Sequence, residues 1–279
     1  MREKIAVITG ASSGFGFLTA LELARRGFHV IATMRNLEKR HHLLNEAETC
    51  GLSKQITIYQ LDVACEASLA QFKAHINKIG RVDVLVNNAG FAVGGFTEEI
   101  PIDDYRKQFE TNVFGAISVA QIVLPIMRKQ RSGHIINISS ISGLIAFPGL
   151  SPYVASKHAL EGWSESLRLE VQPFGIHVVL VEPGSYETNI WSTGKHVSEA
   201  SLHPHSPYYE YMERLEDHLA SGSHILGNPS EIAQKIAWIA EHDRPSLRYS
   251  LGKGVKFAIF MKHFLPWQLW ERLVQKQLK

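Results

Sequence analysis

The sequence predicts one α/β domain built on a doubly wound parallel sheet, with helices on both faces. Short apolar runs such as residues 82–86 alternate along the chain with helical patterns such as residues 66–79. Strands that are apolar on both faces are typical of parallel sheets that helices bury on each side. The 279 residues, of which 45% are apolar, suffice for one large core without a linker.

The composition argues against several classes of protein. Cys50 and Cys65 are the only cysteines, so there is no disulfide framework and no Cys/His cluster with zinc spacing. The net charge of +2, with no basic block interleaved with aromatic residues, argues against a nucleic-acid partner. The first ten residues lack the long apolar core of a signal peptide. We therefore expect a cytoplasmic protein.

A glycine-rich turn joins the first predicted strand to the first predicted helix. Residues 4–9 are largely apolar, and Gly10, Gly14 and Gly16 precede a helical pattern that starts near Leu18. Glycines at this point let the chain turn tightly and let a pyrophosphate approach amide groups at the helix N-terminus. We predict a phosphate-binding turn; the alternative is an ordinary tight loop.

Arg35 follows the second predicted strand, residues 28–33. Near this point of a dinucleotide-binding unit, an acidic residue accepts hydrogen bonds from the adenosine ribose, whereas an arginine accommodates a 2′-phosphate. No acidic residue is present among residues 34–36. Arg35 therefore favours NADP(H) over NAD(H), with Ser12 and Ser13 as further phosphate donors. The alternative is that Arg35 is a solvated loop residue.

Polar residues follow the next two predicted strands. The chain continues with a polar helix, a third strand, a second helix and a fourth strand, at residues 37–49, 56–61, 66–79 and 82–86. Asp62 follows the third strand, and Asn87 and Asn88 follow the fourth. Sheets of this kind bind ligands outside the carboxyl ends of their strands. We expect these side chains at the ligand-binding edge.

Residues 102–127 are predicted to form one long helix that contains Asn112 and Gly115. Asparagine is a poor residue for a helix interior because its amide competes for backbone hydrogen bonds. A local contact must therefore favour Asn112. We expect it to bind a water or a backbone group near the active centre; the alternative is a tolerated surface residue.

Three residues of the next segment can do proton chemistry together. A fifth predicted strand, residues 133–140, ends at Ser140, and Pro152 suits the first turn of a helix that runs to about residue 171. Tyr153 and Lys157 are four residues apart on this helix, so their Cβ atoms lie about 5–6 Å apart. A protonated lysine favours the phenolate and lowers the phenol pKa from about 10. A further strand is predicted over residues 176–181.

These pieces resemble the short-chain dehydrogenase/reductase family over nearly the whole chain. They are Thr9-Gly10-x3-Gly14-x-Gly16, Asp62-Val63, Asn87-Asn88-Ala89-Gly90, Asn112, Ser140, Tyr153-x3-Lys157 and Pro183-Gly184-x3-Thr188. The resemblance implies a Rossmann-type single domain, a nicotinamide dinucleotide, no metal, and hydride transfer between a hydroxyl and a carbonyl. Residues 31–35 look like the NADP-preferring branch that includes hydroxysteroid dehydrogenases acting on bulky apolar alcohols.

The resemblance also implies a role for each motif residue. Tyr153 is the acid/base on the substrate oxygen, and Ser140 orients that oxygen. Lys157 holds the nicotinamide ribose and depresses the tyrosine pKa, while Asn112 holds a water in a proton relay. The implied cofactor-binding residues are Gly10, Ser12, Ser13, Gly14, Phe15, Gly16, Arg35, Asp62, Val63, Asn88, Ala89, Gly90, Tyr153, Lys157, Pro183, Gly184 and Thr188. Asp62 meets the adenine edge, Asn88 the adjoining ribose region, and residues 183–188 the nicotinamide amide.

The resemblance makes residues 186–226 a substrate lid within a domain of residues 1–254. This segment is irregular and carries the apolar side chains Trp191, Tyr208, Tyr209, Tyr211 and Met212. Its histidines, at positions 196, 203 and 205, lack the spacing of helical metal ligands. Beyond it, we expect a helix capped by Asn228 and a final strand over residues 248–251.

Residues 255–279 form an apolar, basic tail. From Lys253 to Lys279, six Lys or Arg stand against Glu271 alone, so this stretch carries +5 and the rest of the chain −3. Pro266 predicts two short helices, which are too interrupted to span a bilayer. Three roles compete: a cap over the substrate pocket, a dimer-packing element, and a helix at a membrane surface. The proline favours the cap.

The sequence thus predicts an NADP(H)-dependent oxidoreductase. Its substrate is a small-molecule alcohol or carbonyl compound with a bulky apolar body, such as a steroid, retinoid or lipid. The family resemblance implies a homodimer or homotetramer. The alternative is a binding protein that senses NADP(H) without turnover. The intact set of Ser140, Tyr153 and Lys157 argues against a sensor, which has no need of all three.

Overall fold

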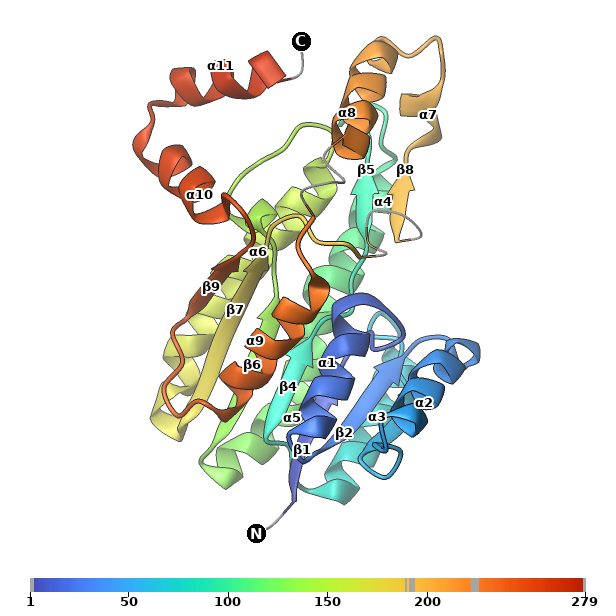
Figure 1. Ribbon diagram of the computed structural model, residues 1–279, viewed down its shortest axis with the longest axis vertical. Coiled ribbons are helices and arrows are strands. Elements are labelled where there is room, and N and C mark those ends of the chain that lie inside the picture. Colours follow the sequence, from blue (N-terminus) through green and yellow to red (C-terminus); the bar gives the residue numbers. More distant parts are fainter. Residues whose placement is uncertain (1–2, 189, 191–193, 222–225, 278–279) are drawn as a thin grey trace.

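A seven-stranded parallel sheet forms the centre of the computed structural model, which describes residues 3–188, 190, 194–221 and 226–277. The strand order is β3-β2-β1-β4-β6-β7-β9 (Figure 1). The strands are β1 Lys4–Ile8, β2 Phe28–Met34, β3 Ile56–Gln60, β4 Val84–Asn87, β6 Gly133–Ile138, β7 Ile176–Pro183 and β9 Arg248–Leu251. The predicted doubly wound α/β domain is confirmed.

Helices cover both faces of this sheet. On one face lie α1 Gly14–Arg25, α2 Arg40–Thr49 and α9 Pro229–Glu241. On the other lie α3 Glu66–Ile79, α5 Gly115–Gln130 and α6 Ser151–Val171. Short 3₁₀ turns at η1 Leu37–Lys39, η3 Ile141–Gly143 and η4 Gln172–Phe174 complete the connections. As expected, Asn228 caps α9, because its side chain accepts a hydrogen bond from the Ser230 amide at 2.9 Å.

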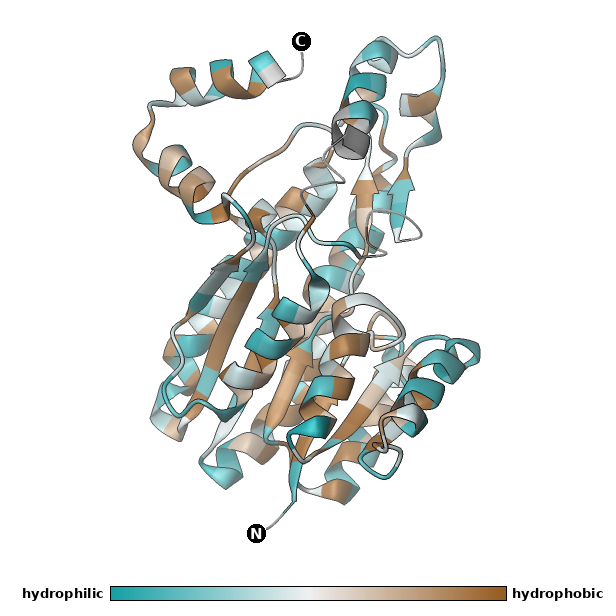
Figure 2. Ribbon diagram, in the orientation of Figure 1, coloured by the Kyte–Doolittle hydropathy of each residue, from teal (hydrophilic) through white to brown (hydrophobic). Residues whose placement is uncertain are grey.

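The strand sequences are apolar throughout because each strand supplies side chains to two cores. In β1, Ala6 and Ile8 face the core beneath α1, whereas Val7 faces the core beneath α5. All three are fully buried. Figure 2 shows the same arrangement as brown strands between helices whose outer faces are teal. Hydrophobic burial on both faces therefore fixes the sheet as the middle layer.

The long helix of residues 102–130 contains a π-helical segment. It begins as α4 Ile102–Phe109, widens at η2 Glu110–Phe114, and continues as α5. The whole run is long and apolar enough to cross a membrane, but half of its most apolar window is buried against the rest of the protein. Its apolar character is therefore that of a core helix.

The segment after β7 is more regular than the sequence indicated. β8 Lys195–Val197 pairs in parallel with β5 Ala92–Gly94 to form a second, two-stranded sheet. The helices α7 Glu199–Leu202 and α8 Tyr209–Ser221 follow it. Trp191, which we expected in the lid, lies outside the described residues. The short strands escaped prediction because three residues carry too little periodicity to identify a strand.

The tail forms two helices, α10 Val255–Phe264 and α11 Trp267–Gln277, which meet at Pro266. The division into two short helices is confirmed. Figure 1 shows both standing away from the sheet, at the end of the molecule opposite the N-terminus. Val255 is the buried residue that anchors α10.

Candidate active site

The carboxyl ends of β1 and β4 bring the first group of predicted residues together. The Asn88 side chain donates to the carbonyl oxygens of Thr9 at 2.9 Å and Gly10 at 3.0 Å. The Thr9 hydroxyl in turn accepts from the amides of Asn88 and Ala89. Both N–H donors of the Asn88 side chain are thus used to hold the glycine turn in place.

The glycine turn leads directly into α1, whose first residue is Gly14. Ser13 occupies the N-cap position, but its side chain makes no capping hydrogen bond. The helix has no acidic residue in its first turn. Its first amide groups therefore have no intrahelical acceptor and favour an anion. Gly14 has φ +56°, and a Cβ built there would meet only the Thr188 side chain, at 3.8 Å or more.

The structure gives Gly16, which the resemblance makes a cofactor-binding residue, a packing role. It does not line the cavity at the strand ends. A Cβ at this position would lie 2.4 Å from Asn88 Nδ2 and 2.5 Å from the Gly10 carbonyl oxygen. The residue must therefore be glycine so that α1 can pack against the turn and the end of β4.

Basic side chains lie at the end of the cavity next to β2. Arg35 and Lys39 are both exposed and both line it, together with Asp62 after β3. The Asp62 carboxylate accepts a hydrogen bond from the Ala64 amide at 3.0 Å, which fixes its loop. Lys39 was not among the predicted residues. Its signal was its position four residues after Arg35, at the end of a short helical turn.

Asn112 explains the π-helical segment. Its side chain accepts from the Phe91 amide at 3.2 Å and donates to the Phe91 carbonyl at 3.1 Å. It also donates to the Ser156 hydroxyl at 3.3 Å. Of the two partners that we expected, the structure shows the backbone group. Asn112 is 3% exposed and stands behind the cavity wall rather than in it.

Ser140, Tyr153 and Lys157 meet at the end of β6. All three are buried and line the cavity. The Ser140 and Tyr153 hydroxyl groups are hydrogen-bonded to each other. The Lys157 ammonium donates to the Ile138 carbonyl at 2.8 Å and lies 5.6 Å from the centre of the Tyr153 ring. The structure thus brings together the three residues for which the sequence predicted joint proton chemistry.

The pKa values of the pair differ from our expectation. Burial raises the pKa of Tyr153 to about 12, and its hydrogen bond with Ser140 opposes this only in part. Burial likewise lowers the pKa of Lys157 to about 8, while the Glu161 carboxylate raises it. The expected depression of the tyrosine pKa by Lys157 is therefore wrong for the chain alone. Loss of hydration outweighs the Ser140 hydrogen bond, so Tyr153 is protonated at neutral pH.

The remaining predicted residues follow β7. Pro183, Gly184 and Thr188 line the cavity beside Tyr186, which the sequence analysis missed. The Tyr186 ring is 3% exposed and packs edge-on against Phe15 at 5.8 Å. A Cβ on Gly184 would lie 2.4 Å from the Val255 side chain. The first residue of the tail helices thus packs directly under this end of the site.

One cavity of about 600 Å³ collects these groups. Its volume is within the range of ligand pockets. Every implied cofactor-binding residue except Gly16 lines it, whereas none of the described residues of α10 or α11 does. The uncapped amides of α1 at one wall and the Ser140, Tyr153 and Lys157 group at another fit an elongated dinucleotide. Among the described residues, no group of His, Cys, Asp or Glu could hold a metal ion.

A parallel sheet with an anion-binding helix N-terminus and a buried Ser, Tyr and Lys group defines a dinucleotide-binding oxidoreductase site. The comparisons with known proteins agree. The family model described as "short chain dehydrogenase" matches residues 4–197. The chain therefore belongs to the short-chain dehydrogenase family.

Three curated relatives extend this result. The uncharacterized oxidoreductase YusZ of Bacillus subtilis is 47% identical over 100% of this chain and 99% of its own. The 3-ketodihydrosphingosine reductase of Bacteroides thetaiotaomicron is 36% identical over 92% of this chain and 90% of its own. Human 17-beta-hydroxysteroid dehydrogenase type 1 is 32% identical over 89% of this chain and 77% of its own. The predicted resemblance to hydroxysteroid dehydrogenases is confirmed.

Solved structures share the fold over nearly the whole chain. A short-chain dehydrogenase from Streptomyces avermitilis superimposes with a TM-score of 0.83 and is 34% identical, covering 99% of this chain and 98% of its own. ElxO with NADP bound has a TM-score of 0.76 and 30% identity, covering 92% of this chain and all of its own.

Proposed function

We propose that the protein is an NADP(H)-dependent oxidoreductase that interconverts a hydroxyl and a carbonyl on a bulky, apolar, lipid-like molecule. The observation that carries this proposal is the buried group of Ser140, Tyr153 and Lys157 at the wall of a dinucleotide-sized cavity. A nicotinamide cofactor supplies the hydride when bound. The proton chemistry falls to the protein.

In the reducing direction, Tyr153 donates its proton to the substrate oxygen. Its raised pKa keeps that proton in place until negative charge develops on the oxygen. Ser140, already hydrogen-bonded to Tyr153, donates to the same oxygen and stabilises the developing charge. The Lys157 ammonium then lowers the cost of the phenolate that remains.

Arg35 and Lys39 support the choice of NADP(H). Both are exposed basic side chains at the β2 end of the cavity, where a 2′-phosphate would lie. Ser12 and Ser13 line the same region and offer further donors. ElxO, a structural relative, has NADP bound. Titration of R35A/K39A with NADPH and with NADH tests this part of the proposal.

An apolar substrate is supported by the aromatic residues next to the site. Phe96 stacks on Tyr208 at 4.3 Å and on Tyr211 at 5.2 Å, which packs α8 against the loop after β5. Phe91, Tyr186 and Ile190 line the cavity itself. Relatives named for a sphingoid ketone and for steroids point to the same chemical class.

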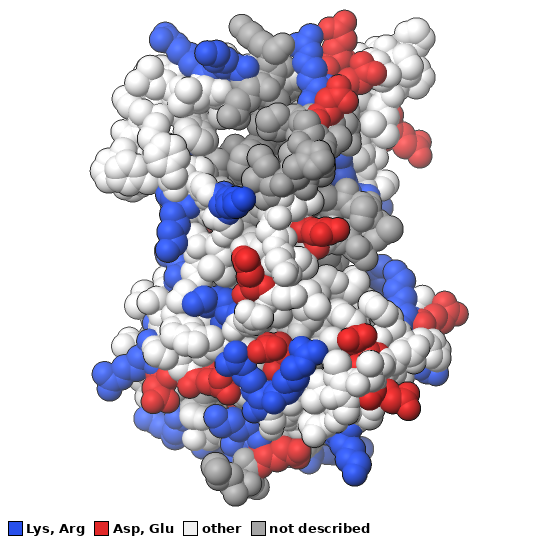
Figure 3. Space-filling view, viewed as in Figure 1, with Lys and Arg blue, Asp and Glu red and all other residues white. Residues whose placement is uncertain are grey.

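We propose that the tail contacts an anionic membrane surface and that the protein is cytoplasmic, at the membrane periphery. Phe257, Phe260 and Phe264 lie on one face of α10 and are 68%, 55% and 67% exposed. Figure 3 shows basic side chains over α11 beside uncharged surface near the turn between the helices. Exposed aromatic residues can enter the membrane interface while neighbouring basic residues are attracted to anionic headgroups.

The basic charge of the tail argues against pairing of this face with the same face of a second copy, because such pairing would bring like charges together. Co-sedimentation with phosphatidylcholine vesicles, with and without phosphatidylserine, tests the membrane contact. Binding that needs phosphatidylserine and is lost in F257S/F264S supports it, whereas no binding overturns it. We also propose a homodimer or homotetramer, formed through other surfaces. Light scattering of the purified protein tests this proposal, and a monomeric mass overturns it.

NADPH oxidation with a panel of carbonyl compounds tests the proposed function. We expect turnover with 3-keto sphingoid bases, retinal or 3- and 17-ketosteroids, and little with small polar ketones. Cofactor binding without turnover across the panel would instead favour the NADP(H)-sensing protein.

A further inference from the structure

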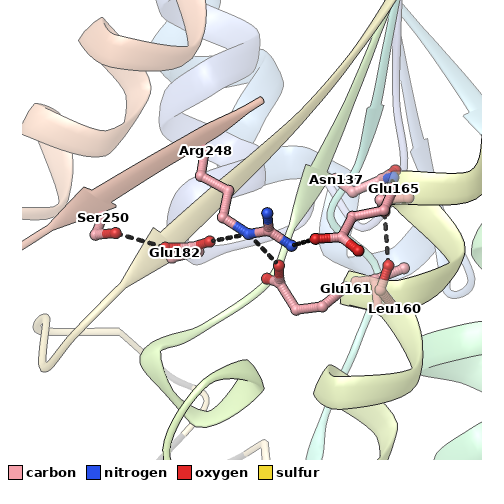
Figure 4. A network of polar contacts seen from close by, with 8 residues as sticks. Asn137, Leu160, Glu161, Glu165, Glu182, Arg248 and Ser250 are labelled. Atoms are coloured by element: carbon pink, nitrogen blue, oxygen red, sulfur yellow. Dashed lines mark hydrogen bonds and ion pairs between the residues drawn. The ribbon is translucent and has the colours of Figure 1, made fainter. Parts of the chain in front are cut away.

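A cluster of charged residues joins α6, β7 and β9 (Figure 4). Arg248 of β9 is at its centre. Its Nε lies 2.9 Å from a carboxylate oxygen of Glu161 and 3.1 Å from one of Glu182. Its Nη2 lies 2.6 Å from Glu165. Ser250 donates to the second oxygen of Glu182 at 2.5 Å.

The depth of this cluster sets it apart from surface ion pairs. The side chains of Glu161 and Glu182 are 6% and 0% exposed, whereas Glu165 is 53% exposed. Buried carboxylates carry a large desolvation cost that an ion pair offsets only in part. Burial raises the pKa of Glu182 to about 7. Glu161 therefore forms the principal ion pair of the cluster with Arg248, whose side chain is 30% exposed.

Glu161 touches each element that carries a catalytic group. It lies one helical turn after Lys157 on α6, so the two side chains share a face. Its side chain packs against Gly143, where a Cβ would lie 2.9 Å from Glu161 Cγ and 3.2 Å from its Oε1. Gly143 ends the 3₁₀ turn that begins after Ser140. Through Arg248, Glu161 is also linked to Glu182, which precedes Pro183.

One oxygen of Glu161 has no hydrogen-bond partner among the described residues. This atom, Oε1, is buried and faces the turn after Ser140, while Oε2 holds Arg248. An unsatisfied carboxylate oxygen is costly in a protein interior. This oxygen lies against the turn that follows Ser140, on a residue one helical turn after Lys157.

We propose that Glu161, held by Arg248, is a positioning residue that keeps the Lys157 ammonium charged and fixes the turn that carries Ser140. The groups that face Lys157 are the Ile138 carbonyl, Tyr153 and Glu161. Those that face Glu161 are Arg248 from β9, Glu182 from β7, Glu165 and Lys157 on its own helix, and the Gly143 turn. Glu161 is thus the negative charge nearest in sequence and on the same helical face as the ammonium.

The test measures the Lys157 amine directly, because the catalytic consequence rests on the proposed function. In protein labelled with ¹³C at lysine Cε, the signal that is lost in K157M identifies Lys157, and its chemical shift is followed against pH. We expect a midpoint near the pKa of about 8 in the wild type. In E161Q it should fall by roughly half to one pH unit, since a nearby negative charge favours the ammonium.

E165Q is the matched control. Glu165 also binds Arg248, but it is half exposed and two turns from Lys157. The Lys157 midpoint in E165Q should therefore stay at the wild-type value. E161D keeps the carboxylate and should restore most of the shift. Thermal unfolding shows whether each variant folds, and E161M replaces E161Q if the latter does not.

Failure of this proposal can be distinguished from failure of the proposed oxidoreductase function. An E161Q or E161M midpoint equal to that of the wild type overturns the proposal, and so does an equal shift in E165Q. Failure of the wild type to reduce any carbonyl overturns the proposed function but leaves the titration readable. If both hold, the alkaline limb of kcat for reduction should move to lower pH in E161Q and return in E161D.

Discussion

The Lys157 ammonium lies 2.8 Å from the carbonyl oxygen of Ile138, the last residue of β6. This contact ties α6, which carries Tyr153 and Lys157, to the strand that leads into Ser140. It also removes the amine from water, and burial is the main cause of its lowered pKa. The same packing that assembles the site therefore sets its proton chemistry.

The free energy of unfolding should depend on pH because Lys157 is buried. Its pKa falls from 10.5 to about 8 on folding, so the full cost of burying the charge applies below pH 8 and disappears as the pH rises toward 10.5. The wild type should therefore gain stability relative to K157M between pH 7.5 and 10, by roughly 2–3 kcal/mol. Thermal unfolding of both proteins at the two pH values measures the change. A constant difference in Tm would contradict the lowered pKa.

Gly16 should tolerate no side chain. A methyl group there would collide with the Gly10 carbonyl oxygen and the Asn88 amide, so G16A should lose about 1–3 kcal/mol of stability. G162A is the matched control, because a Cβ at Gly162 of α6 meets nothing within 4 Å. It should gain about 0.4–1 kcal/mol. Urea unfolding measures both, and equal stabilities would refute the packing role.

Arg35 and Lys39 should determine the cofactor. R35A/K39A removes the basic groups at the β2 end of the cavity and should raise the Kd for NADPH about tenfold or more while changing that for NADH little. R40A, an exposed arginine outside the cavity, is the control. Fluorescence titration of each protein with both cofactors gives the ratio. Equal losses for NADPH and NADH would rule out a 2′-phosphate site here.

Asn112 should hold the loop after β4. N112D keeps the acceptor for the Phe91 amide but loses the donors to the Phe91 carbonyl and Ser156. Unpaired buried groups of this kind cost about 1–3 kcal/mol each. We expect a lower Tm and weaker NADPH binding. E110Q, a change at the exposed start of the same π-helical segment, should leave both near the wild-type values.

The sequence predicts the sheet well because a strand that is buried on both faces needs an uninterrupted run of apolar residues. Val84 to Val86 and Val178 to Val181 are such runs. The strands β5 and β8 were missed, since each has three residues and their pairing joins positions about a hundred residues apart. The π-helical segment was visible only as an unexplained asparagine.

The site was predictable as far as its residues act through local spacing. Tyr153 and Lys157 lie one turn apart, and the glycine turn sits between adjacent elements. The pKa directions were not predictable, because they depend on how deeply folding buries each group. Nor was the pair of Arg248 and Glu161, which are 87 positions apart in the chain. They meet because β9 lies beside β7 in the sheet and α6 packs against β7.

In the proposed reaction the buried Tyr153 hydroxyl transfers the proton. A comparison of wild type and Y153F, for NADPH binding and for the rate of NADPH oxidation with the best carbonyl substrate, tests this role. Y153F should bind NADPH within about threefold of the wild type and lose about 10²–10⁴-fold in kcat. Retention of most of the wild-type kcat by Y153F, with binding unchanged, would show that Tyr153 is not the proton donor.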